Sequence, residues 1–174
     1  SDASEDPASD GAAAPAGAAP AEVPLEVRVE AARVLVPRYE ANADYERLLD
    51  ALEVLGQGDD PLERFRSLRR AAEVADVGLE DAPKAFELLG RAVRAGLAED
   101  DLEAMLRDYR RLAEAAGAWS EYALLLEEVA PEILDGELQV QAFARVAEVA
   151  RDPLDDPDRA KRLSERVLKV QPDD

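Results

Sequence analysis

Residues 72–85 read AEVADVGLEDAPKA, and residues 147–160 read AEVARDPLDDPDRA. The two stretches share Ala-Glu-Val-Ala at their start, and the Leu, Asp and Ala that follow occupy equivalent positions. Each shared residue of the second copy lies 75 positions after its counterpart (147 − 72 = 75). A fixed long spacing of this kind is typical of a chain built from repeated structural units.

Half of this offset separates a further series of positions. Three steps of 37, 37 and 38 residues connect Leu48, Ala85, Tyr122 and Ala160. Around them apolar residues recur with the period of an α-helix, about 3.6 residues, rather than the period of a strand. A period of 20 to 50 residues built from helix pairs is the signature of a solenoid.

Short breaks rich in Asp, Gly and Pro divide the apolar pattern into helices. Pro37 lies inside the first of these helices, and it must either kink that helix or mark a late start. We expect helices at about 25–41, 44–57, 61–77, 81–96, 100–116, 119–134, 137–151 and 156–171.

The predicted fold class is all-α, an α-solenoid of about four antiparallel helical hairpins. A compact eight-helix bundle is the alternative, but it gives no reason for a spacing of 37 residues, whereas stacked pairs require equal spacing. The predicted repeat domain covers residues 25–174. Its hairpins are expected at about 25–57, 61–97, 100–134 and 137–171.

Composition excludes several classes of function. The chain has 40 acidic and 21 basic residues and a formal net charge of −19, and it contains no His and no Cys. The negative charge repels phosphate backbones and anionic lipids, so we expect no nucleic acid and no membrane insertion. Ser-His-Asp triads, thiolate nucleophiles and ordinary zinc sites are excluded. Neither a phosphate-binding loop nor an EF-hand ladder is present, and we predict no cofactor and no metal.

The first 24 residues differ from the rest, because they include nine Ala, four Pro and five acidic residues but no basic one. We expect residues 1–24 to be a disordered acidic arm or linker, since so little apolar surface cannot offset the entropy of ordering. The basic start and apolar run of a signal peptide are missing. Because the chain begins with Ser1 rather than Met, we expect a processed product or a segment of a longer protein.

Some of these residues resemble the landmarks of the tetratricopeptide repeat (TPR) family, whose units are helix pairs of about 34 residues. Ala160, Val167 and Pro172 resemble the small, apolar and terminal proline landmarks of a second TPR helix. Leu35 and Tyr39 resemble the apolar and tyrosine landmarks of a first helix.

The resemblance covers about 25–172, although the units here are 37 or 38 residues long. The second and third hairpins end on Leu97 and Leu134, where a TPR unit typically has a proline. The resemblance implies a right-handed superhelix in which the first helix of each hairpin lines a concave groove.

Arginine accumulates in the middle of the chain, where residues 61–116 hold ten basic and twelve acidic residues. Guanidinium groups bind carboxylates in a bidentate way, so arginines in a groove favour an acidic peptide or helix. The predicted partner-binding residues are Arg66, Arg69, Arg107 and Arg111, with Arg33 as a further contributor. The alternative is that these arginines only pair along their own helices, with Glu63, Glu73, Asp108 or Glu114.

Two other residue sets have structural interpretations. The acidic runs at 99–101 and 155–156 precede helices, and we expect them to cap helices rather than to bind calcium. The aromatic residues lie on apolar helix faces, and we expect them to pack in the core. They are Tyr39, Tyr45, Phe65, Phe86, Tyr109, Trp119, Tyr122 and Phe143.

The sequence therefore predicts a non-catalytic protein–protein interaction scaffold whose concave groove binds a peptide or helix of a partner protein. One alternative is a structural or self-assembling repeat segment of a larger protein, which would form homo-oligomers. Another is a carboxylate-based enzyme or a ligand-binding helical bundle.

Overall fold

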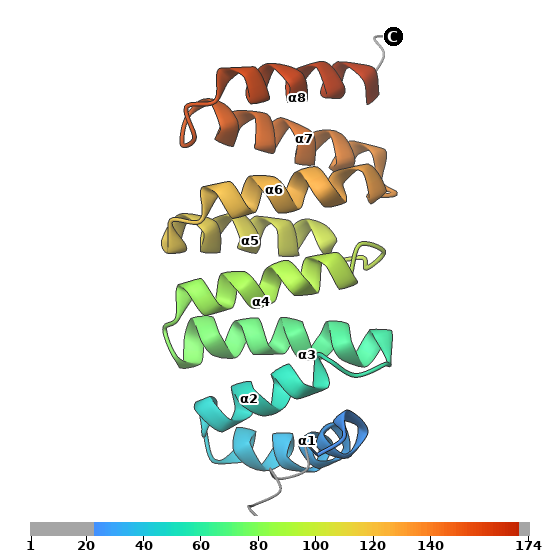
Figure 1. The fold of residues 1–174 in the computed structure, drawn as a ribbon, viewed down its shortest axis with the longest axis vertical. Coiled ribbons are helices and arrows are strands. Elements are labelled where there is room, and N and C mark those ends of the chain that lie inside the picture. Colours follow the sequence, from blue (N-terminus) through green and yellow to red (C-terminus); the bar gives the residue numbers. More distant parts are fainter. Residues whose placement is uncertain (1–22, 171–174) are drawn as a thin grey trace, which may run out of the picture.

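The computed structural model describes residues 23–170, which form eight α-helices without a β-strand (Figure 1). The predicted all-helical class is confirmed. Of the predicted arm, only Val23 and Pro24 are among the described residues, and Pro172 also lies outside them. The helices are α1 (Leu25–Ala41), α2 (Tyr45–Leu55), α3 (Pro61–Glu73), α4 (Ala82–Ala95), α5 (Leu102–Ala116), α6 (Trp119–Val129), α7 (Gly136–Arg151) and α8 (Pro157–Val170).

Aspartates cap several of these helices. The side chain of Asp60 accepts hydrogen bonds from the backbone N–H groups at the start of α3, and Asp135 does the same at α7. Asp156 accepts from the backbone of α8 and confirms the capping prediction for residues 155–156. Asp101 makes no such bond at α5, because its carboxylate pairs with Arg69 instead.

Two helices end differently from the prediction. After α3 the backbone widens into a π-helical turn, η1 (Val74–Gly78), in which the carbonyl of Val74 accepts from the N–H of Leu79. After α6 it tightens into a 3₁₀ turn, η2 (Ala130–Glu132), because Pro131 has no N–H to continue an α-helix. The predicted helices over 61–77 and 119–134 are thus not α-helical to their ends.

The first helix continues through Pro37, so the late start considered from the sequence is wrong. A proline in a helix interior removes one backbone hydrogen bond and bends the helix. Figure 1 shows α1 changing direction along its length, in agreement with the predicted kink.

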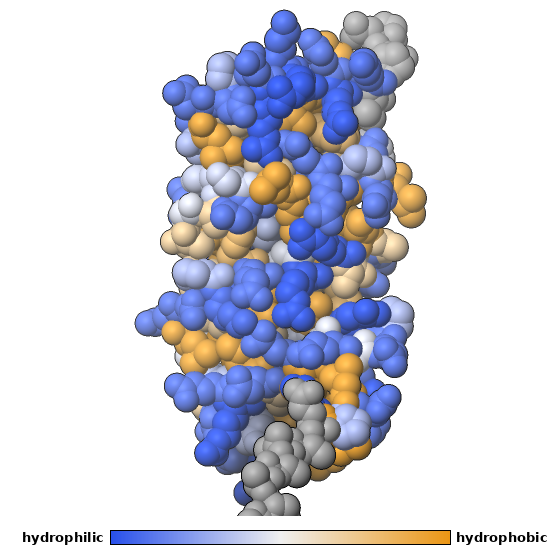
Figure 2. Space-filling view, viewed as in Figure 1, coloured by the Kyte–Doolittle hydropathy of each residue, from blue (hydrophilic) through white to orange (hydrophobic). Residues whose placement is uncertain are grey.

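The helices follow one another in sequence order along the long axis of the molecule (Figure 1). Each helix packs mainly against the helices before and after it. The loops α1–α2, α3–α4, α5–α6 and α7–α8 lie on one side of this view, and the remaining loops lie on the other. One continuous cluster of buried apolar side chains runs from Val29 in α1 to Leu163 in α8. Hydrophilic side chains cover most of the visible face (Figure 2).

An aromatic stack connects α4, α5 and α6 in the middle of the core. The ring of Tyr109 stacks on Phe86, with centroids 4.5 Å apart, and on Tyr122, at 5.4 Å. Trp119 meets Tyr122 edge-on at 5.8 Å. Aromatic pairs of this kind contribute about 0.5–1.5 kcal/mol beyond the area that they bury. The predicted core position of these rings is confirmed, with Trp119 only half-buried.

Tyr45 is the exception among the aromatic residues predicted to pack in the core. It is 42% exposed, whereas Phe65 and Phe143 are buried and Tyr39 is half-buried. Tyr45 is the first residue of α2, and its ring lies over Gly78 of η1, where an added Cβ would be 2.9 Å from the ring. The ring therefore covers η1 from the solvent side, and core packing of Tyr45 is a wrong prediction.

We expect the protein to lose stability above about pH 10 because two tyrosines are buried. Burial raises the pKa of Tyr109 and of Tyr122 above the ordinary value of 10.0. The unfolded chain then ionises at a pH where the folded chain stays neutral. The stabilisation is fully present below the unfolded pKa and decreases as the pH rises above it. Urea denaturation at about pH 8 and about pH 11 measures this loss, and Tyr122→Phe should reduce it.

The stability of the Tyr122→Phe variant at neutral pH is the control for this experiment. The hydroxyl of Tyr122 is buried and has no hydrogen-bond partner in residues 23–170. Its removal should leave the free energy of unfolding unchanged or higher, since an unpaired buried hydroxyl is costly. An alkaline loss as large in the variant as in the wild type would contradict this account.

Candidate partner-binding groove

Helix α3 turns an arginine-rich side to solvent. Phe65 and Leu68 point into the core. An amphipathic helix with one buried side exposes its opposite side to solvent. Arg66 and Arg69 are exposed on that opposite side. The helix begins at Pro61, a residue suited to the first helical position because its missing N–H needs no partner there.

Helix α5 repeats this arrangement one hairpin later. Met105, Tyr109 and Leu112 are buried, while Arg107 and Arg111 are exposed on the opposite side. The helix ends at a glycine with a φ of 66°, in the left-handed region that favours glycine after the last helical turn. The first helices of the second and third hairpins thus expose matching pairs of arginines.

Three of the five predicted arginines form ion pairs with acids of a neighbouring hairpin. In one of these pairs, Arg33 donates two hydrogen bonds to the Glu63 carboxylate, at 2.7 and 2.6 Å. These bonds lower the pKa of Glu63 below its ordinary value. The pairs are Arg33–Glu63, Arg69–Asp101 and Arg111–Asp76.

The other two predicted arginines, Arg66 and Arg107, are exposed and take part in no ion pair within residues 23–170. Arg66 and Arg107 are therefore the predicted arginines whose charge no acid of the described chain neutralises by direct contact. Arg64 of α3, which is half-buried, forms no ion pair within these residues either.

Pairing along the same helix, the alternative considered from the sequence, also occurs. Arg33 pairs with Glu30, and Arg111 pairs with Asp108 at 4.0 Å. Arg70 pairs with Glu73 at 2.6 Å.

A groove runs between α3 and α5. One part is a pocket of about 390 Å³ between α3, η1 and α5, and the other is a pocket of about 560 Å³ between α3 and the α4–α5 loop. Arg69 and Glu73 line both parts, so we treat them as one, the α3–α5 groove. Arg66 and Arg111 also line it, and Val77 stands beside it with 74% of its surface exposed.

Ion pairs also connect the second helices of neighbouring hairpins. Three of them are Lys84–Glu53 at 2.8 Å, Arg94–Glu128 at 2.8 Å and Arg159–Glu127 at 2.5 Å. Sequence reasoning missed all of these partners because it considered only acids on the same helix. The available signal was an opposite charge 30 to 35 residues away, close to one repeat length.

Within residues 23–170, no group of three or more acidic side chains is placed to hold a metal ion. None of the described helices is both long enough and apolar enough to cross a membrane. Comparison with family models, with curated proteins and with solved structures finds no match to this chain.

Proposed function

We propose that the chain is a helical solenoid of four antiparallel hairpins, similar to tetratricopeptide repeats, and that it serves as a protein–protein interaction scaffold. Two observations support the repeat interpretation. The main contacts of each helix are with its sequence neighbours. Ion pairs also recur between helices that are one hairpin apart. A compact bundle would instead depend on contacts between helices distant in the sequence.

The proposed binding site is the α3–α5 groove, and one observation carries this proposal. Arg66 and Arg107 expose guanidinium groups that no described acid binds. Arg69 and Arg111 already bind acids of neighbouring segments, so they shape the groove more than they attract a ligand. The attraction for a partner then comes from Arg66, which lines the groove, and from Arg107, which lies on α5 but lines neither part of the groove.

The ligand that fits this groove is an acidic peptide or helix of a partner protein. Its carboxylates would accept bidentate hydrogen bonds from the unpaired guanidiniums of Arg66 and Arg107. An apolar side chain of the same segment would cover Val77, which exposes most of its surface beside the groove. The overall charge of −19 disfavours acidic ligands elsewhere on the molecule, so binding depends on these local positive charges.

Selection from a library of short random peptides tests the proposal. Peptides enriched on the wild type should carry several acidic residues and at least one apolar residue. Their affinity, measured by fluorescence polarisation, should fall by about tenfold or more in a variant with both Arg66→Glu and Arg107→Glu, because charge repulsion replaces a charge-assisted hydrogen bond. Circular dichroism must first show that the variant keeps its helical content.

A matched variant with Arg38→Glu and Arg162→Glu changes the net charge equally at exposed positions outside the groove. Equal weakening of binding in both variants would mean that net charge, not the groove, controls affinity. Failure to enrich any peptide would also contradict the proposal. It would favour end-to-end association, for which the exposed Val27 and Val34 of α1 are the supporting observation.

A further inference from the structure

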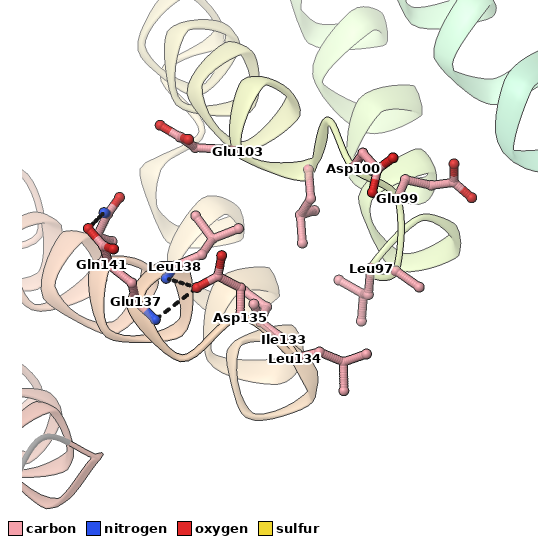
Figure 3. A pocket seen from close by; sticks show the side chains of 12 residues that line it. Leu97, Glu99, Asp100, Glu103, Ile133, Leu134, Asp135, Glu137, Leu138 and Gln141 are labelled. Carbon is pink, nitrogen blue, oxygen red and sulfur yellow. Dashed lines mark hydrogen bonds between the residues drawn. The ribbon is translucent and has the colours of Figure 1, made fainter.

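We propose that a second pocket, between α5 and α7, binds a basic segment of a partner protein that also carries a leucine-sized apolar side chain. This site borders the α3–α5 groove, with which it shares Glu99 and Asp100, and its ligand has the opposite charge. The pocket has a volume of about 390 Å³ and is formed by the α4–α5 loop, the α6–α7 loop and the first turns of α5 and α7 (Figure 3).

Apolar side chains make up one part of the pocket. Leu134 in the α6–α7 loop is 87% exposed, the largest exposed fraction among the large apolar side chains of residues 23–169. Leu97 and Ile133 lie close to it in Figure 3. Hydrophobic surface is also visible at the edge where the α6–α7 loop lies (Figure 2). A solvent-exposed leucine beside a pocket offers apolar area that a partner side chain would remove from water.

The loop that carries Leu134 is held in place by side-chain hydrogen bonds. Gln139 of α7 donates to the carbonyl of Ala130 at 3.0 Å and to that of Pro131 at 3.3 Å. Asp135 accepts from the backbone N–H groups of Glu137 and Leu138, as Figure 3 shows. The pocket is therefore formed before a ligand arrives, which lowers the entropy cost of binding.

The charged side chains around the pocket are all acidic. Glu99 and Asp100 come from the α4–α5 loop, Glu103 from α5 and Glu137 from α7. No basic residue lines the pocket, and none of these four carboxylates forms an ion pair within residues 23–170. Glu99 and Asp100 also line the α3–α5 groove, whereas Glu103 and Glu137 line only this pocket of the two.

Unpaired carboxylates on several sides of an apolar pocket fit a basic, apolar peptide. Lysine or arginine side chains of such a peptide would neutralise the carboxylates, while a leucine-sized side chain would cover Leu134. The acids come from the α4–α5 loop, from α5 and from α7 (Figure 3), and no three of them are placed to hold a metal ion. Charge complementarity therefore selects a basic segment as the occupant.

Binding of a labelled probe peptide tests this proposal. The probe contains equal numbers of leucines and lysines, and two comparison peptides replace every leucine by serine or every lysine by glutamate. At about 0.15 M salt, the wild type should bind the leucine–lysine probe. Both comparison peptides should bind much more weakly than this probe. Both the variant with Glu103→Gln and Glu137→Gln, which line this pocket and not the groove, and the single variant Leu134→Ser should bind the probe about fivefold or more weakly.

Matched variants separate the pocket from general charge and hydrophobicity. A variant with Glu46→Gln and Glu121→Gln removes the same charge at exposed positions elsewhere. Leu124→Ser removes another exposed leucine, which is 61% exposed on α6. Both should bind the probe like the wild type. Equal weakening by these controls, equal binding of the serine peptide, or no binding of the probe would each overturn the proposal.

The variant with Arg66→Glu and Arg107→Glu should retain probe binding, because neither arginine lines this pocket. Loss of acidic-peptide binding with intact probe binding would therefore concern the α3–α5 groove alone. Loss of probe binding with intact acidic-peptide binding would concern the pocket between α5 and α7 alone. The two proposals can therefore fail separately.

Discussion

Replacing Tyr109 with alanine is expected to lower the free energy of unfolding by about 3–5 kcal/mol. The ring is 2% exposed and stacks on Phe86 of α4 and on Tyr122 of α6. Truncation would leave a cavity between the second and third hairpins and would remove both aromatic pairs. Urea denaturation followed by circular dichroism at neutral pH measures the loss.

The same variant also tests how the hairpins depend on one another. In a solenoid, each hairpin is stabilised by the interface with its neighbours. Weakening the interface between α4 and α5 should therefore broaden the unfolding transition, as the two halves of the chain begin to unfold separately. Tyr109→Phe keeps the stacked ring and should change stability by less than about 1 kcal/mol. A loss below this value in the alanine variant would contradict the packing described here.

Replacing Gly96 with alanine should lower the free energy of unfolding by about 1–3 kcal/mol. Gly96 is the residue after α4, and an added Cβ would lie 2.7 Å from Cδ2 of Phe65 and nearer still to Cε2. Phe65 is 4% exposed, so its ring has little space in which to move. The added methyl group therefore forces the α4–α5 loop away from α3.

A double-mutant cycle isolates this contact. Combining Gly96→Ala with Phe65→Leu should cost less than the sum of the two single changes, because the smaller side chain makes room for the methyl group. Gly136→Ala is the matched control, since an added Cβ there meets nothing within 4 Å. As a helical position, it should be neutral or gain up to about 1 kcal/mol. Equal losses at Gly96 and Gly136 would contradict the proposed clash.

The helices were predictable because the sequence pattern indicates both the buried side of each helix and the residues at which it begins. Apolar residues at helical spacing identify the buried side, and capping residues such as Asp60 identify the starts. The π turn at Val74–Gly78 was not predictable in this way, because its apolar pattern also suits an α-helix. Tyr45 was misassigned for a related reason, since spacing alone does not tell a ring in the core from one that covers a turn.

The candidate site was less accessible to sequence reasoning than the fold. Helical spacing predicts that Arg69 and Arg111 share a face with other arginines, but the acids that bind them lie on other elements. These pairings depend on how neighbouring hairpins pack, which local spacing does not contain. The pocket between α5 and α7 was missed because Glu99 and Glu137 are 38 residues apart and line one pocket only in the folded chain (137 − 99 = 38).

A nuclear magnetic resonance titration tests the central claim most directly. The ¹⁵N-labelled protein is titrated with the acidic peptide that binds it most tightly in the library selection, and the backbone amide shifts are assigned to residues. Binding in the proposed groove should shift amides of α3, η1 and α5, including those of Arg66 and Arg111, and leave α8 unchanged. Shifts confined to α1 or α8, or spread evenly over the chain, would contradict a partner-binding site between α3 and α5.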